Sequence, residues 1–291
     1  MAGFDDLLDT QTQVAPQDGD FDKEAWAVQK QEEREGLFAL SDETALGVAA
    51  DSAVFTQYLD TQARLDRYST TNVLLVMAQK PEATRLGSFD HWKQQHCSVQ
   101  SGQTAIRIVE PHRYTKEDGT PGTGYNIKKV FDVSQVDTRR LRPATAPQRT
   151  ERQLLAALVA ASPVKVSGAD KVPDGGKMMV DPDSGEITVQ RGMEFSDTFR
   201  CVAQGVTAAH LLGGPDSQMD AAFSAQSAAY MLCKKHGVDT QDFDFSRASE
   251  VLSGKDAQAV KGELTQIRDT AEDISRIMAQ QLEPRKPEAR S

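Results

Sequence analysis

The sequence lacks the long apolar runs of membrane proteins. No stretch of its 291 residues approaches the roughly 20 consecutive apolar residues that span a bilayer. Cysteine is scarce as well: Cys97, Cys201 and Cys233 are far apart and form no CxxC pair, which excludes a cysteine-based metal knuckle and is typical of a reducing compartment. We expect each to be a small buried apolar residue. The first residues, MAGFDDLLDTQ, are acidic, unlike a secretory signal, so we expect a cytoplasmic protein without a membrane partner.

Charge is unevenly distributed along the chain. The net charge is −10, and 38% hydrophobic with 26% charged residues indicates a soluble, mostly globular protein. Residues 1–54 carry 3 Lys/Arg against 13 Asp/Glu, residues 55–142 carry 13 against 9, and residues 143–291 carry 17 against 21. The one basic segment points to nucleic acid as its partner. The acidic arm before it either competes with nucleic acid for that segment or is a solvated tail.

Residue patterns divide the first half into an arm and a compact unit. Residues 1–50 have few large apolar residues after Leu8, so we expect an acidic, largely disordered arm with a short helix near 22–38. Helical spacing predicts helices over 53–67 and 71–79, the second opened by Ser69 or Thr70, and a short one over 90–95. Alternation predicts paired strands over 104–115 and 122–136, joined by the turn-rich residues 116–124.

The second half is mainly helical. Residues 142–150 form a proline-bearing linker, followed by a helix over 151–162 and a β-hairpin with strands 177–180 and 186–191. A buried helix begins near Phe199, a helix rich in small residues ends at Gly237, and an amphipathic helix covers 260–283. The fold class is therefore α+β. We expect a small α+β domain with an antiparallel sheet over 53–141, a mainly helical domain with a β-hairpin over 151–280, and a disordered tail over 281–291.

Several motifs of the first domain occur together in a recognisable order. A Tyr-Ser-x-x-Asn helix start is followed by aliphatic residues, a Trp-bearing helix, a Val-x-x-Gly turn and an Ile-rich strand: Tyr68, Ser69, Asn72, Leu74, Leu75, Trp92, Val99, Gly102, Ile106 and Ile108. Over residues 53–138 this order resembles the N-terminal domain of ArdC-type antirestriction proteins. The resemblance implies binding of single-stranded DNA, and a protein carried by a conjugative mobile element to shield incoming DNA from restriction.

Binding of single strands requires cations for the phosphates and flat faces on which bases stack. The candidate DNA-binding residues are Tyr68, Asn72, Trp92, Lys93, Arg107, Arg113, Tyr114, Tyr125, Lys128 and Lys129. Some of them have structural alternatives. Trp92 is also suited to anchor the core, Lys128 and Lys129 to protect an edge strand, and Tyr68 with Asn72 to brace the start of a helix.

Residues 150–280 resemble the metallopeptidase-like domain that follows this module, and the ImmA/IrrE class of zincins. Their HExxH helix follows a hairpin; its two histidines share one helix face and bind zinc, and its glutamate activates water. Alignment on the preceding Phe-Arg places Gln204 and Ala208 at the histidines, Gly205 at the glutamate, and Gln226 at the glutamate ligand of the next helix. None of these side chains supports the chemistry. We therefore expect no catalytic residue, no metal and no cofactor.

The polar residues left near the altered motif have structural uses. Gln204 and Gln226 are expected to hydrogen-bond to each other across the former metal site. His210 is expected to cap or pack against a helix terminus, and His236 to lie in solvent at the end of its helix.

Three interpretations of function remain. The first is a single-stranded-DNA-binding, antirestriction-like protein with an inactive peptidase-like domain. The second is a regulatory factor whose pseudo-peptidase groove holds a peptide of a host or element-encoded protein. The third is a metallopeptidase with displaced ligands. Salt separates the first two, because binding through phosphates weakens steeply as salt rises, and a metal analysis tests the third.

Overall fold

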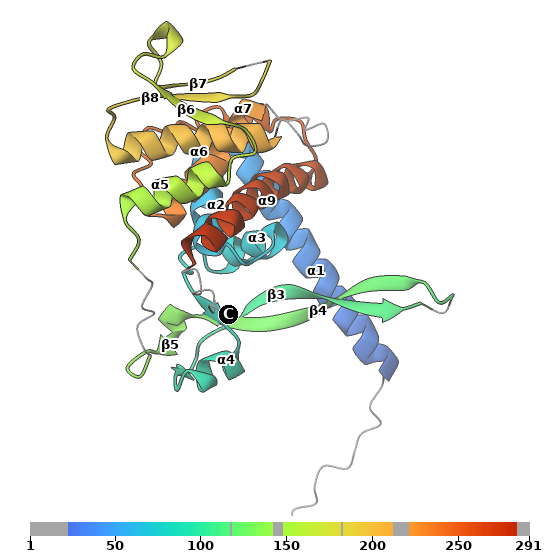
Figure 1. Ribbon diagram of the computed structural model, residues 1–291. Coiled ribbons are helices and arrows are strands. Elements are labelled where there is room, and N and C mark those ends of the chain that lie inside the picture. The colour runs from blue at the N-terminus through green and yellow to red at the C-terminus, as the bar shows by residue number, and fades with distance from the viewer. Residues whose placement is uncertain (1–22, 117, 142–147, 182, 212–220, 284–291) are drawn as a thin grey trace, which may run out of the picture.

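The computed structural model describes residues 23–116, 118–141, 148–181, 183–211 and 221–283. It combines helices with small, mostly antiparallel sheets, which confirms the α+β class. Helices form the centre of the molecule, with sheets toward both ends (Figure 1). Within the described ranges, no helix combines the length and apolarity that crossing a membrane requires.

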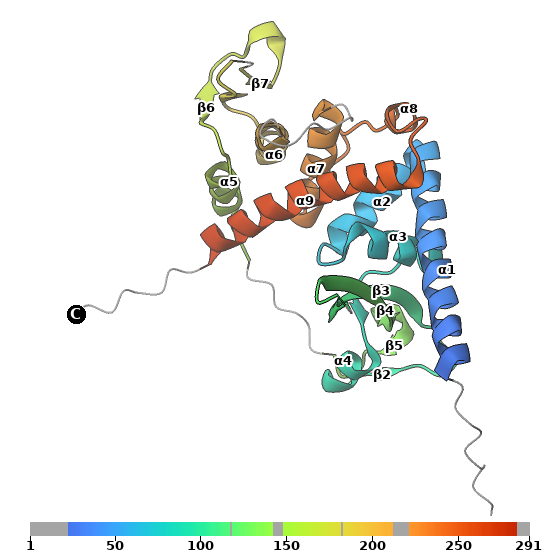
Figure 2. The ribbon, with the colours of Figure 1, turned by 90° about the vertical axis from the view of Figure 1, so that its right-hand side faces the viewer.

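The short helix expected near residues 22–38 is part of the longer helix α1 (Lys23–Ala50), so the expectation of disorder is wrong for residues 39–50. Leu37, Ala45 and Val48 recur at helical spacing and are buried against α3 and α9. Figure 2 shows α1 running along one side of the molecule. The first half of the helix is largely exposed and polar, so the sequence offered little indication that the second half is buried. Residues 1–22 of the predicted arm lie outside the described residues.

Two short helices follow α1, and a side chain caps the start of each. The side chain of Asp51 accepts hydrogen bonds from the first turn of α2 (Ser52–Arg64), and Ser69 caps α3 (Thr70–Gln79) as the sequence predicted. Phe55 and Leu59 of α2 are fully buried in the main core. This packing fixes the loop before α3, where the candidate residue Tyr68 lies.

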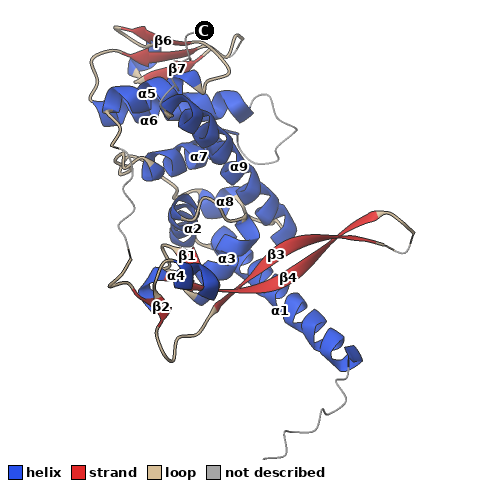
Figure 3. Cartoon of the chain, turned by 60° about the horizontal axis from the view of Figure 1, so that its bottom comes forward, coloured by secondary structure: helices blue, strands red, loops and turns tan. Residues whose placement is uncertain are grey.

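The sheet of the first half is built around one long hairpin. Strands β3 (Ile106–Thr115) and β4 (Pro121–Asp132) pair in register from Ile106 with Val130 to Thr115 with Pro121, and the ribbon projects from the body (Figure 3). Around its base lie β1 (Leu86–Gly87), α4 (Phe89–Gln94), β2 (Ser98–Val99), a 3-10 turn (Val133–Gln135) and β5 (Val136–Asp137). β1 extends the hairpin sheet beside β4, and β2 pairs with β5.

The second half begins with α5 (Glu151–Ala160), capped by Thr150. Strands β6 (Val166–Ala169), β7 (Met178–Val180) and β8 (Ile187–Gln190) form a sheet of order β6-β8-β7, with a 3-10 turn (Pro173–Gly175) between β6 and β7. The predicted hairpin is β7 with β8, and β6 adds a parallel strand. The helices that follow are α6 (Phe195–Leu211), α7 (Ala221–Lys235), α8 (Ala248–Val251) and α9 (Ala257–Leu282).

The predicted halves share one hydrophobic core. Buried residues of α2 and α3 belong to the same cluster as those of α6, α7 and α9. α9 crosses the centre of the molecule and packs against α1, α3, α5 and α7 (Figure 2). Most of the predicted linker, residues 142–147, lies outside the described residues, as do residues 284–291 of the predicted tail.

Candidate nucleic-acid interface

The two faces of the β3–β4 hairpin have different neighbours. One face, here called the open face, carries Ile108, Lys128, Glu110, His112 and Tyr114, which alternation and register place on one side; Ile108, at its base, is buried in the main core. The opposite side, the α1 face, carries Arg107, Lys129, Val109, Tyr125 and Arg113. Val109 packs with Leu37 of α1, and Tyr125 meets the ring of Phe38 edge-on with centroids 5.3 Å apart. The long helix therefore occupies much of one face.

The outer part of the open face carries two aromatic rings laid over glycines. His112 lies opposite Gly124, and Tyr114 lies opposite Gly122. A Cβ atom on either glycine would come within 2.6 Å of the facing ring, so only glycine leaves room for the rings against the backbone. The Tyr114 side chain remains 48% exposed. This arrangement presents flat rings to solvent in fixed positions.

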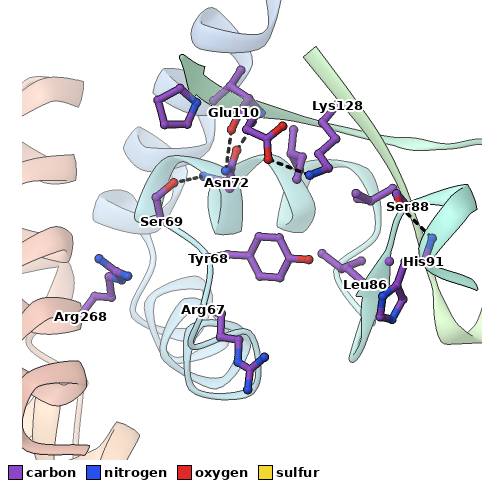
Figure 4. A pocket seen from close by; sticks show the side chains of 15 residues that line it. Arg67, Tyr68, Ser69, Asn72, Leu86, Ser88, His91, Glu110, Lys128 and Arg268 are labelled. Carbon is purple, nitrogen blue, oxygen red and sulfur yellow. Dashed lines mark hydrogen bonds and ion pairs between the residues drawn. The ribbon is translucent and has the colours of Figure 1, made fainter. Parts of the chain in front are cut away.

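A cavity of about 570 Å³ lies at the base of the same face. Its walls come from the loop before α3, from β1 and α4, from the hairpin and from α9; they include Arg67, Tyr68, Ser69, Asn72, Ser88, His91, Glu110, Lys128 and Arg268. Figure 4 shows the Tyr68 ring across the middle of the cavity, with Arg268 on one side and Leu86 and His91 on the other. The cavity is therefore rich in cationic and hydroxyl groups around one ring.

The cations of this cavity differ in how far they are neutralised. Lys128 donates to Glu110 at 2.7 Å, and both side chains are partly exposed. Arg67 is exposed and forms no ion pair with any residue that the structure describes. Burial raises the pKa of the Tyr68 hydroxyl, while the nearby charges of Lys128 and Arg67 oppose that shift. Tyr68 therefore stays protonated and can donate a hydrogen bond at neutral pH.

Asn72 has the structural role that the sequence allowed as the alternative to DNA contact. Its side chain is 8% exposed, and it both donates to and accepts from the backbone of Val109 at 2.9 Å. Gln79, two turns later, makes the same pair of bonds with the backbone of Arg107 at 2.9 Å. The two amides cover the outer edge of β3. Asn72 lines the cavity, but its amide is fully engaged by the strand.

Among the candidate DNA-binding residues, the structure corrects one prediction and places most of the others on the two faces of the hairpin. Trp92 is fully buried, and its indole nitrogen donates to the carbonyl of Phe131 at 3.0 Å, so its prediction as a DNA contact is wrong. Lys93, its neighbour on α4, is exposed. Of the others, the structure brings together Tyr68, Asn72 and Lys128 at the cavity and Tyr114 farther out on the same face. Arg107, Arg113, Tyr125 and Lys129 lie on the α1 face.

Sequence reasoning missed four residues of this surface: Arg67, His91, His112 and Arg268. Arg67 directly precedes the Tyr-Ser-x-x-Asn motif that begins at Tyr68, so its charge was a usable signal. The HRY segment of one strand and the GTG segment of its partner also contained a signal, because glycines opposite rings indicate close approach. Arg268 is 200 residues away from Tyr68 in the sequence, and only the packing of α9 reveals it.

The second predicted site lies on α6, where Gly205 sits against the sheet. A Cβ atom at this position would come within 2.7 Å of Ile187 Cγ2 on β8. Gln204 and Ala208, which the sequence alignment places at the two histidines, are half-buried. The expected pairing of Gln204 with Gln226 is wrong, because the Gln226 amide donates to the carbonyl of Asp244 at 3.1 Å.

A cavity of about 360 Å³ beside Gln204 is lined by compensated charges. Arg200 is buried and binds Asp197, Asp239 at 3.4 Å and Asp242 at 2.5 Å, while Lys177 binds Asp197 at 3.0 Å. Among the described residues, no group of three or more His, Cys, Asp or Glu side chains is placed to hold a metal ion. The acidic residues near α6 are therefore held by side-chain cations.

The remaining histidines have structural surroundings. His210 Nε2 lies 2.9 Å from the carbonyl of Ala161, the residue that ends α5, which confirms its expected role at a helix terminus. The solvent position expected for His236 is wrong. Burial, with a smaller contribution from Lys235, lowers its pKa to about 4, and its ring packs edge-on against Phe199.

The three cysteines are free and buried, as expected. Burial raises the pKa of Cys233 to about 12 and also raises that of Cys201. Both thiols therefore stay protonated at neutral pH and are poor nucleophiles.

Known proteins are similar to this chain in its first domain and in its fold. Residues 48–153 match the family model of the N-terminal domain of the anti-restriction factor ArdC. The metal-free crystal structure of the antirestriction protein ArdC from the R388 plasmid shares 15% identity and a TM-score of 0.51, over 73% of this chain and 86% of that one. Its Mn(II)-bound structure shares 16% identity and a TM-score of 0.47, over 73% and 85%. No curated protein sequence matches the chain.

Proposed function

We propose that this chain, which matches the ArdC N-terminal domain over residues 48–153 and is similar to ArdC in fold, binds single-stranded DNA through the open face of the β3–β4 hairpin. The strand runs from the rings of His112 and Tyr114 to the cavity around Tyr68. Bases stack on the rings, and phosphates meet the cations of the cavity.

One observation carries the proposal: exposed aromatic rings and a cationic cavity occupy the same face of one projecting ribbon. Stacking on an aromatic ring contributes about 1–3 kcal/mol per base and tolerates any sequence. Duplex DNA hides its bases from such rings. The glycines beneath Tyr114 and His112 keep the rings flat against the strand, which favours stacking over insertion into a groove.

We further propose that the second half is a peptidase-like domain without catalysis. Gln204, Gly205, Ala208 and Gln226 supply neither zinc ligands nor a general base. The close packing of Gly205 on Ile187 supports this, because a glutamate there would displace the sheet. The protein then acts in the cytoplasm as an antirestriction factor of a mobile element, by binding DNA and not by cleaving protein.

Two neighbouring lysines on opposite faces provide the sharpest test of the DNA surface. Lys128 points to the open face and Lys129 to the α1 face, so each can be changed to glutamine with the same loss of charge. Lys128→Gln should weaken binding of a labelled oligonucleotide and reduce the salt slope of log K by about 0.7, the value for one single-strand phosphate contact. Lys129→Gln should leave both nearly unchanged. Fluorescence anisotropy at several salt concentrations measures both quantities.

The opposite ranking, with Lys129→Gln weakening binding more than Lys128→Gln, would place the strand on the α1 face and contradict the proposed surface. Thermal melting of both variants provides the folding control. Both lysines have partly or fully exposed side chains, so neither change should alter stability by more than about 0.5 kcal/mol.

A further inference from the structure

We infer that the cavity at the base of the open face is a phosphate-binding subsite built by both halves of the chain, in which Arg268 of α9 joins Arg67 and Lys128. The inference rests on the proposed function, because the phosphate belongs to the bound DNA strand. It adds a binding residue from the second half to a surface that the N-terminal domain otherwise provides.

Hydrogen bonds between α3 and α9 hold Arg268 at the cavity wall. Thr265 donates to the hydroxyl of Thr70, the first residue of α3, at 3.0 Å. The buried Tyr58 hydroxyl lies 3.4 Å from the same Thr70 oxygen and 3.5 Å from the carbonyl of Leu264. Arg268 follows Thr265 by one helical turn, so the tether that joins the helices also sets the position of the guanidinium.

The hydrogen bonds of Arg268 leave it able to bind a phosphate. Its terminal nitrogens pair with Asp269 at 2.7 Å and Glu272 at 2.5 Å, and these carboxylates are 52% and 46% exposed. Ion pairs with exposed partners contribute little to stability. The Nε atom is buried and has no hydrogen-bond partner among the described residues. A turn of the guanidinium toward a phosphate would replace weak pairs with charge-assisted bonds and would give Nε an acceptor.

The rest of the cavity also favours an anion. Ser69, the N-cap of the 10-residue helix α3, lines it, so the positive end of the helix dipole contributes. Arg67 has no ion pair with a described residue. Glu110 is the carboxylate in the lining and pairs with Lys128, so the lining cations Arg67, Lys128 and Arg268 outnumber it. The Tyr68 ring between the cations offers a face for the base of the same nucleotide (Figure 4).

Two arginines of α9 make a matched test. Arg268→Gln removes the cavity cation, whereas Arg276→Gln removes a cation two turns later that pairs with Asp273 at 2.8 Å and lies outside the cavity lining. We expect Arg268→Gln to weaken oligonucleotide binding on the order of tenfold at low salt and to reduce the salt slope of log K by about 0.7. Arg276→Gln should change neither. Arg268→Lys, which keeps the charge, should recover part of the affinity.

The source of the phosphate is resolved by comparing oligonucleotides with a 5′-hydroxyl and a 5′-phosphate. Equal affinities mean that the cavity takes a phosphodiester within the strand. Tighter binding of the 5′-phosphorylated strand by the native chain, with the difference lost in Arg268→Gln, means that it takes the strand end.

Equal affinities of folded Arg268→Gln and Arg276→Gln for the oligonucleotide would overturn the inference, provided the native chain binds it. That result leaves the proposed function intact. Failure of the native chain to bind the oligonucleotide at low salt contradicts the proposed function itself, so the two failures are distinct. Thermal melting shows whether both variants are folded. If only Arg268→Gln fails to fold, Arg268→Lys provides the test. A folded Arg268→Lys variant with native affinity would count against a binding role specific to the guanidinium.

Discussion

Gly205 lies where α6 packs on β8, and its missing side chain allows the helix to approach the strand. Ile187 of β8 is fully buried and occupies the space that a side chain at position 205 would need. The absence of a side chain lets the sheet close on the helix, so a glutamate at this position would require the sheet to move.

We predict that Gly205→Ala lowers the free energy of unfolding by on the order of 1–2 kcal/mol, because overpacking against Ile187 outweighs the gain in helix propensity. Gly262→Ala in α9 is the matched control: it is also within a helix, and a Cβ atom there has no neighbour within 4 Å. It should stabilise the protein by about 1 kcal/mol. Urea unfolding of both variants gives the comparison.

The effect of Gly205→Ala should change sign in an Ile187→Ala background, since the colliding methyl groups are then gone. A loss of the same size in both backgrounds would mean that the helix, and not the contact with β8, sets the cost. Local patterns place Gly205 on a helix and Ile187 on a strand, but they do not show that the two residues pack against each other. Trp92 is a similar case, because its burial depends on a carbonyl of β4.

At the scale of elements, α3 serves as the neighbour that the edge strand β3 lacks. Asn72 and Gln79 each pair with both backbone groups of one strand residue, as another strand would. The pair at Asn72 is buried, whereas the pair at Gln79 is accessible to water. The hairpin is therefore held to the helical body mainly at its inner end.

Asn72→Ala should cost about 2–4 kcal/mol of unfolding free energy, because it leaves a buried N–H and a buried C=O of Val109 without partners. Gln79→Ala should cost less than about 1 kcal/mol, because water replaces its amide at Arg107. Chemical unfolding measures both. Similar losses for the two variants would show that burial does not separate the inner pair from the outer one.

Spacing and alternation predicted the longer helices and the β7–β8 hairpin of the second half, and the hairpin of the first, but not β6 or α8. Which face of the hairpin would be open could not be predicted, because both faces carry cations and tyrosines in the sequence. Leu37 and Phe38 of α1 pack on Val109 and Tyr125 of the α1 face, although Arg107 and Lys129 on that face stay exposed. Local patterns contain no information on that contact.

At the scale of the whole molecule, α1 and α9 join the predicted domains into one body. The polar helix α1 buries only one apolar residue every one or two turns, as at Leu37, Ala45 and Val48. This pattern is too sparse to predict burial without the partner helices. α9 supplies a partner for α1 and α3 and also the cavity residue Arg268. The predicted boundaries near residue 150 therefore divide the chain in sequence more than in packing.

The groove beside Gln204 offers the competing account, in which a partner peptide and not DNA is the ligand. Its cations, Lys177 and Arg200, are compensated by Asp197 and Asp242, so peptide binding there should change little with salt. The cavity on the open face should respond strongly, because its ligand releases counterions. Salt dependence therefore separates the two accounts in the intact chain.

The most direct measurement is the anisotropy of a labelled single-stranded oligonucleotide titrated with the full chain over a series of salt concentrations. With phosphate contacts at Arg67, Lys128 and Arg268, we predict binding at low salt and a slope of log K against log salt of about −2. A duplex of the same sequence should bind more weakly, because its bases cannot reach the rings of His112 and Tyr114. No binding of the single strand at low salt, or binding that does not change with salt, would contradict the account.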